Sequence, residues 1–162
     1  MRATVHSGYV PGCIGRIAQM HAEYYAQHAS FGLHFEAKVA QELAQFCQSF
    51  SPERDGLWLA ITPEVQGSIA IDGAHAATEG AHLRWFITSD SLRGQGIGRQ
   101  LLQSALAFCD ERQYRRVFLW TFAGLDAARH LYEAAGFRLE HESPGDQWGT
   151  RVQEQRFVRG EI

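Results

Sequence analysis

AHLRWFITSDSLRGQGIGRQLL, residues 81–102, is the stretch that decides the fold. An apolar strand over 81–88 runs into a turn that carries Gly94, Gly96 and Gly98, and the turn leads directly into a helix. Glycine lets a backbone approach a ligand closely, the turn gathers N–H groups in one concavity, and the helix N-terminus adds partial positive charge. The stretch therefore predicts a site for a phosphate-bearing ligand.

Two common phosphate-binding designs do not match this turn. A nucleotide-binding P-loop has Lys and then Ser or Thr after its last glycine, whereas Gly98 is followed by Arg99 and Gln100. A dinucleotide-binding fold places its glycine motif near the first strand and continues in repeated βαβ units, which this chain lacks. What remains is a turn that binds a phosphate-bearing cofactor without magnesium.

Length and composition predict one domain over residues 1–162. With 45% hydrophobic residues, the chain can bury a sizeable core. A net charge of -3 and a pI near 6.2 argue against a nucleic-acid partner. No signal-peptide pattern or segment of membrane-spanning length is present, so we expect a cytoplasmic protein without a membrane partner. The three cysteines and the scattered histidines lack the spacing of a metal site, so no metal and no disulfide is expected.

Hydrophobic periodicity along the chain predicts a mixed α/β domain. The strand at 81–88 and the next strand are joined through a helix, which implies that the two strands are parallel. The preceding strands read as an antiparallel meander. In chain order, the expected elements are a strand at 2–7, helices at 11–28 and from Phe35 to Phe50, strands at 57–62, 67–72 and 81–88, a helix from Ile97 to Cys109, a strand at 116–121, a helix at 126–135, and strands at 137–143 and 151–158.

Two motifs in this order resemble the GCN5-related N-acetyltransferase (GNAT) superfamily. Residues 93–98, RGQGIG, are similar to its Gln/Arg-x-x-Gly-x-Gly/Ala pyrophosphate motif, and residues 128–137, ARHLYEAAGF, are similar to its Ala-x-x-Leu-Tyr-x-x-x-Gly-Phe helix. Residues 31–39, FGLHFEAKV, further resemble acetyltransferase domains found fused to MarR-type regulators. The resemblance implies a GNAT fold: a mixed central sheet of about seven strands with four helices, splayed between the fourth and fifth strands.

The resemblance also implies that acetyl-coenzyme A binds in the cleft where the sheet splays. The strand end at 86–88 would pair by backbone with the pantetheine arm, and the N–H groups of the glycine turn would hold the pyrophosphate. Where the family often has Asn, this chain has Leu125, so a polar contact to the cofactor is missing there, and we expect the neighbouring Asp126 to cap the helix. The expected cofactor-binding residues are Phe86, Ile87, Thr88, Arg93, Gly94, Gln95, Gly96, Ile97, Gly98, Arg99 and Asp126.

Direct acetyl transfer from a thioester to an amine needs no protein nucleophile, but it needs a base for the amine proton and an acid for the departing thiolate. Tyr132 matches the family's usual acid, and we expect it at the start of the short helix, facing the cleft. His82 lies eleven residues before Arg93, an offset at which family members that acetylate arylalkylamines carry a His. An imidazole pKa near ~6.5 suits a base at neutral pH. Glu79 and Glu36 are the fallback carboxylates, and a purely structural role is the alternative for each of these residues.

The first two helices and the last hairpin usually wall the acceptor pocket of this fold. We expect Trp85 and Trp148 to bound a small, partly apolar amine, and Tyr25 and Phe35 to lie in the core. The leading function is an N-acetyltransferase that moves an acetyl group from acetyl-CoA to a primary amine of a small molecule or peptide, by direct transfer in a ternary complex. The alternative, favoured by Leu125, is an acetyl-CoA sensor without turnover. Homodimers are common in the family, and no feature of the sequence decides the oligomeric state.

Overall fold

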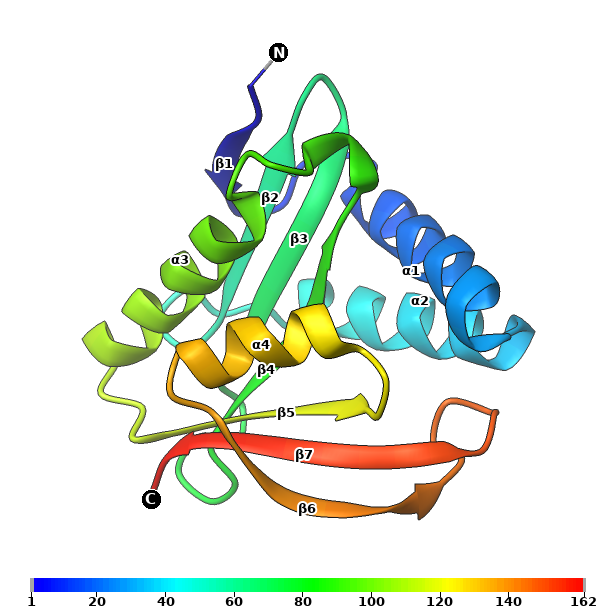
Figure 1. Cartoon of the computed structure of the whole chain (residues 1–162). Coiled ribbons are helices and arrows are strands. Elements are labelled where there is room, and N and C mark those ends of the chain that lie inside the picture. Colours follow the sequence, from blue (N-terminus) through cyan, green and yellow to red (C-terminus); the bar gives the residue numbers. More distant parts are fainter. Residues whose placement is uncertain (1, 162) are drawn as a thin grey trace.

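The computed structural model describes residues 2–161, and its element order is the one that periodicity predicts (Figure 1). The bounds differ from the expected ones by a few residues, as is usual where element ends fray. A short 3-10 helix, Asp90–Leu92, precedes the glycine turn. The elements are β1 (Thr4–Ser7), α1 (Cys13–Ala29), α2 (Leu33–Gln48), β2 (Gly56–Ile61), β3 (Val65–Asp72), β4 (Ala81–Thr88), α3 (Ile97–Glu111), β5 (Arg116–Phe122), α4 (Asp126–Ala134), β6 (Arg138–Gly145) and β7 (Val152–Gly160).

The seven strands form one sheet in the order β1-β2-β3-β4-β5-β7-β6. The β4–β5 pair is parallel, whereas the other neighbouring pairs are antiparallel. The parallel pairing consists of Ala81 opposite Val117 and His82 opposite Phe118, and it ends there. Beyond His82 the two strands diverge (Figure 1), which confirms the predicted splay between the fourth and fifth strands. We call the space between the diverging strands the wedge.

A β-bulge interrupts β4 inside the wedge. Ser68 faces Ile87 and Ala70 faces Arg84, so β4 carries one residue more than β3 over this interval. Trp85, within the bulge, has φ 49°, a conformation that is uncommon for a residue with a side chain. The buried Ser68 hydroxyl donates a 2.7 Å hydrogen bond to the Trp85 carbonyl oxygen and so holds the bulge in place.

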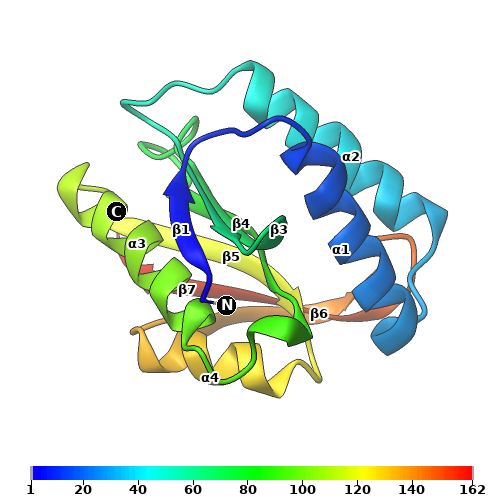
Figure 2. The same cartoon turned by 90° about the horizontal axis from the view of Figure 1, so that it is seen from above.

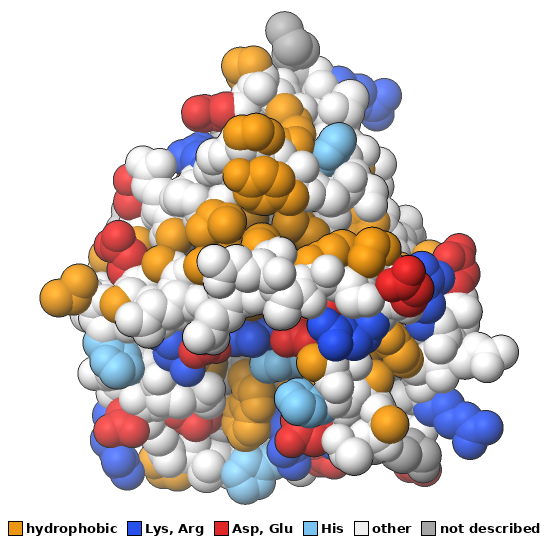
Figure 3. Space-filling view, turned by 180° about the vertical axis from the view of Figure 1, so that it is seen from behind, with side chains coloured by type: hydrophobic (Ala, Val, Ile, Leu, Met, Phe, Trp, Pro, Cys, Tyr) orange, Lys and Arg blue, Asp and Glu red, His pale blue; other side chains and the backbone are white. Residues whose placement is uncertain are grey.

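Helices cover both faces of the sheet and create two apolar cores. Figure 2 shows α1 and α2 on one face of the N-terminal strands and α3 on the other. The α3 side is filled by side chains such as Leu101, Leu119 and Phe157, and the α1–α2 side by side chains such as Ile17 and Leu43. On the face seen in Figure 3, acidic and basic side chains are interspersed. Within residues 2–161, no helix is long and apolar enough to cross a membrane.

Candidate active site

The wedge opens into two adjoining cavities that share the side chains of Tyr25 and Phe86. The wedge cavity, about 370 Å³, lies between β4 residues 82–86, β5 residues 119–122 and the helices α1 and α2. The turn cavity, about 520 Å³, lies between β4 residues 86–88, Gly98 and residues 124–128 at the start of α4. A long ligand in the turn cavity can therefore present one end to the wedge cavity.

The turn cavity collects several of the residues expected to hold the cofactor. Its lining includes Phe86, Ile87, Thr88, Arg93, Gly98 and Asp126. Gly94 and Gly96 have φ 81° and 70°, and a Cβ on either would meet nothing within 4 Å, so glycine is required there by the turn conformation. A Cβ on Gly98 would lie 3.6 Å from Leu131 Cδ1 and 3.7 Å from Phe86 Cζ, on the cavity side.

The N-terminus of α3 is suited to an anion. Its N-cap is Gly96, which offers no side chain to cap the helix, and its first turn holds no acidic residue. The first N–H groups of a helix have no partner inside the helix, and together with the helix dipole they favour negative charge. The residues that are present thus fit a pyrophosphate by their backbone, as the glycine pattern predicts.

Four of the residues expected to bind the cofactor make other contacts or have another position than expected. Gln95 accepts a 3.3 Å hydrogen bond from the Ala3 N–H, and the Ile97 side chain is buried in the core. Arg99 lines a separate groove between α3 and α4. The capping role expected for Asp126 is wrong, because Asp126 is the first helical residue and Leu125 occupies the N-cap without a side-chain hydrogen bond. A residue caps a helix from the N-cap position itself, so Asp126 instead places an acidic group in the first turn.

Tyr132 lines the wedge cavity from the last turn of α4, so its expected place at the start of that helix is wrong. The ring is buried, 5.9 Å from the Phe137 ring and 6.0 Å from the Phe86 ring, and burial raises the pKa of the phenol. No buried side-chain N or O atom among residues 2–161 lacks a hydrogen-bond partner. The Tyr132 hydroxyl makes no hydrogen bond within residues 2–161, so it is not one of these fully buried polar atoms. It therefore faces the open space of the cavity.

His82 lines the same cavity, at the end where the parallel pairing of β4 and β5 stops. Its half-buried ring stacks on Phe118 with the centroids 4.5 Å apart. Burial, and then the positive charge of Arg84, lower the pKa of His82 to about 3, so the ring is neutral at physiological pH. Glu79 and Glu36 are exposed, and neither lines the wedge cavity or the turn cavity. Within residues 2–161, no cluster of His, Cys, Asp and Glu could hold a metal ion.

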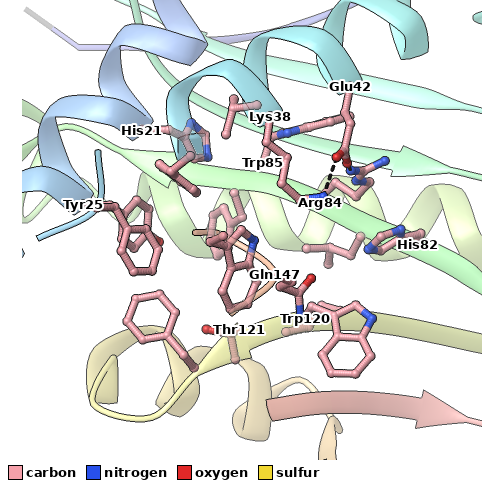
Figure 4. Close-up of a pocket in the computed structure, with 18 of the residues that line it drawn as sticks. His21, Tyr25, Lys38, Glu42, His82, Arg84, Trp85, Trp120, Thr121 and Gln147 are labelled. Atoms are coloured by element: carbon pink, nitrogen blue, oxygen red, sulfur yellow. Dashed lines mark hydrogen bonds and ion pairs between the residues drawn. The ribbon is translucent and has the colours of Figure 1, made fainter. Parts of the chain in front are cut away.

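Sequence reasoning missed a charged cluster in the wedge cavity, which we call the Lys38–Glu42–Arg84 cluster. The Lys38 ammonium lies 2.6 Å from Glu42 Oε2, and the Arg84 guanidinium pairs with Glu42 Oε1. The Arg84 guanidinium also lies over the Trp85 ring, 4.2 Å from its centroid. Figure 4 shows Glu42 meeting the guanidinium of Arg84, with Lys38 beside it on α2 and His82 on β4, two residues before Arg84. The spacing of four between Lys38 and Glu42 could have indicated their ion pair. It gave no indication that Arg84, on β4, would join them.

Aromatic side chains form the rest of the wall. Trp148, which follows β6, stacks on Phe31 at 6.2 Å and lines the cavity as expected, and Trp85 lines it from the bulge. Tyr25 and Phe35 belong to the core side and also line the cavity, so their assignment to the core alone was incomplete.

Comparison with known proteins agrees with this geometry. A model of the acetyltransferase (GNAT) family matches residues 16–137. An acetyltransferase from Streptococcus agalactiae shares the fold at 18% identity and TM-score 0.75, with 99% of each chain covered. A phosphinothricin acetyltransferase from Sinorhizobium meliloti, solved with AcCoA, is 18% identical with TM-score 0.72, covering 99% of this chain and 89% of that one. A GNAT family acetyltransferase from Elizabethkingia anophelis, solved with acetyl-CoA bound, is 16% identical with TM-score 0.66 and 99% of each chain covered.

No match was found among curated protein sequences. The family model nevertheless spans well over half of the chain, including both motifs and the whole of the wedge between β4 and β5. The chain therefore belongs to the acetyltransferase (GNAT) family.

Proposed function

We propose that the protein is an N-acetyltransferase that moves the acetyl group of acetyl-CoA to a primary amine of a small molecule or peptide, in a ternary complex. The observation that carries the proposal is the meeting of the two cavities at Phe86 and Tyr25. The turn cavity offers phosphate-binding backbone, and the wedge cavity offers Tyr132 and His82 beside aromatic walls. A donor held in the first would present its acetyl end to an acceptor held in the second.

The residues of the turn cavity suit acetyl-CoA through backbone groups. Because β4 pairs with β5 only at Ala81 and His82, the edge of β4 from Leu83 onward has no strand partner on that side. Unpaired N–H and C=O groups along Phe86, Ile87 and Thr88 are therefore available to the amides of a pantetheine arm. The N–H groups from Gly94 to Arg99 hold the pyrophosphate, and two proteins of similar fold were solved with this donor bound.

When bound, acetyl-CoA supplies an activated thioester, from which the acetyl group passes to the amine nitrogen as the C–N bond forms and the C–S bond breaks. Tyr132 keeps its proton at physiological pH, because burial raises the pKa of its phenol, and its free hydroxyl donates a hydrogen bond toward the leaving sulfur. His82 is neutral and accepts the amine proton. It lies four residues before Phe86, on the other side of the β-bulge at Trp85, so the proton reaches it through water in the cavity. Its lowered pKa makes His82 a weaker base than the ordinary imidazole expected from the sequence.

Free-thiol release tests this function, with small amines, amino acids and peptide N-termini as acceptors and the mass of the acetylated product as confirmation. Tyr132→Phe should lower kcat by about 100-fold while the affinity for acetyl-CoA is unchanged, since the ring and its packing are kept. Tyr9→Phe is the matched control, because Tyr9 is exposed and lines neither cavity. If acetyl-CoA binds but no acceptor releases thiol, the protein is an acetyl-CoA sensor and the enzymatic proposal fails.

A further inference from the structure

Lys38 is the single lysine of the chain, and it lies inside the candidate acceptor pocket. It lines the wedge cavity, with its side chain one-third exposed and paired to Glu42. Arg84 joins the same carboxylate from β4, with its side chain 21% exposed. Two cations therefore meet one anion inside the candidate acceptor pocket.

In this cluster the carboxylate oxygens are paired, whereas the two cations keep free N–H donors. Each carboxylate oxygen of Glu42 already meets one cation. Burial tends to raise the pKa of Glu42, but Lys38 and Arg84 bring it below its usual value, so Glu42 stays ionised. A lysine has three N–H donors and an arginine five. The only other carboxylate beside these two cations within residues 2–161 is that of Asp72, 3.9 Å from Arg84 Nη1 and too far for a hydrogen bond.

The cluster is thus short of hydrogen-bond acceptors: Lys38, Glu42 and Arg84 by themselves sum to one positive charge, which the more distant carboxylate of Asp72 offsets only in part. The cluster has no free carboxylate oxygen for a further cation, because both oxygens of Glu42 are already paired. It has free N–H donors for an anion on both Lys38 and Arg84. The planar guanidinium of arginine is well matched to a carboxylate. Arg84 also lies only two residues before Phe86, where the two cavities meet, with the bulged residue Trp85 between them.

We infer that the acceptor carries a carboxylate beside its primary amine, and that Lys38 and Arg84 bind this carboxylate. An amino acid with an aromatic or other apolar side chain satisfies the three demands of the cavity. Its carboxylate meets the Lys38–Glu42–Arg84 cluster, its side chain lies against Trp148 and Phe31, and its amine faces the junction at Phe86. The inference deepens the proposed function, because it names the class of amine that the same site acetylates.

Three probes separate the contributions: phenylalanine, 2-phenylethylamine, which lacks the carboxylate, and 3-phenylpropionate, which lacks the amine. Binding is measured by calorimetry on the full chain in the presence of coenzyme A, so that turnover is not required. The two carboxylated probes should bind at least about tenfold more tightly than 2-phenylethylamine, the effect of hydrogen bonds to charged groups. Lys38→Met should remove most of this preference, and Lys38→Arg should keep it within about threefold because it keeps the charge.

The lone lysine also gives a readout that needs no variant. Reductive methylation with ¹³C-formaldehyde labels Lys38 and the N-terminal amine, and the Lys38 resonance should shift on addition of 3-phenylpropionate but not of 2-phenylethylamine. Tighter binding of 2-phenylethylamine, equal binding of all three probes, or no binding of either carboxylated probe would overturn the inference. If the carboxylate preference holds but phenylalanine and every other acceptor fail to release thiol, the anion site stands and the proposed acetyl transfer falls.

Discussion

Replacing Gly98 by alanine should stabilise the free protein. Gly98 is the second residue of α3, and the added methyl would make ordinary contacts with Leu131, Phe86 and Thr88 at 3.6 to 4.0 Å. Its φ lies outside the left-handed region that glycine alone tolerates well. The exchange lowers the conformational entropy of the unfolded chain and raises helix propensity, which together are worth about 0.5–1 kcal/mol. For a chain of this length the melting temperature should rise by about 1–4 °C.

The same methyl should weaken acetyl-CoA binding. It projects toward the turn cavity, where the proposed function brings a pyrophosphate against the backbone of the α3 N-terminus. We expect the affinity to fall at least about tenfold, or about 1.4 kcal/mol. Thermal unfolding with and without acetyl-CoA, together with calorimetry, measures both effects. Compared with the unsubstituted protein, Gly98→Ala should have a higher melting temperature without ligand. Its melting temperature should rise less when acetyl-CoA is added.

Gly96→Ala is the matched comparison. At φ 70° its methyl meets nothing within 4 Å, so the backbone conformation alone should cost about 1–2 kcal/mol of stability. Stability and affinity should therefore fall together in Gly96→Ala and move in opposite directions in Gly98→Ala. An unchanged dissociation constant for acetyl-CoA in Gly98→Ala would refute phosphate binding at this helix end, and a lower melting temperature would refute the steric argument.

Three further substitutions test other parts of the structure. Ser68→Ala removes the 2.7 Å donor of the Trp85 carbonyl and should lower the unfolding free energy by about 1–3 kcal/mol in urea titrations. Burial lowers the pKa of His21 to about 4, although the hydrogen bond to the carbonyl oxygen of Ile17 tends to raise it. Stability should therefore fall as the pH drops from 6.5 toward 4, by about 2 kcal/mol at pH 5 from this residue, and His21→Leu should lose that much less in urea titrations at pH 7 and pH 5. Trp148→Ala should raise the KM of the best acceptor about tenfold or more in thiol-release assays and leave acetyl-CoA affinity unchanged; an equal KM would remove the aromatic wall from the acceptor site.

The fold and the glycine turn were predictable because their signals are local. Periodicity marks each helix and strand, and a helix between two adjacent strands makes the β4–β5 pair parallel. A phosphate site built from backbone groups needs no particular side chain, so three glycines and a helix start are enough to suggest one. The prediction was wrong where a motif had to be placed in three dimensions: Tyr132 lies in the last turn of α4, since that helix already begins at Asp126.

The charged part of the proposed acceptor side could not be predicted in the same way, because its residues come from elements far apart in the chain. On a helix surface, Lys38 and Glu42 at a spacing of four read as a solvated pair worth a few tenths of a kcal/mol. Packing of α2 beside β4 adds Arg84, and this third group turns a neutral pair into a cluster with one net positive charge. Glutamate in place of Lys38 would change that charge by two units without altering any residue of the turn cavity. Under the proposed function, the donor and the acceptor are bound by largely separate sets of residues, so the chemistry of the acceptor can change while the turn stays the same.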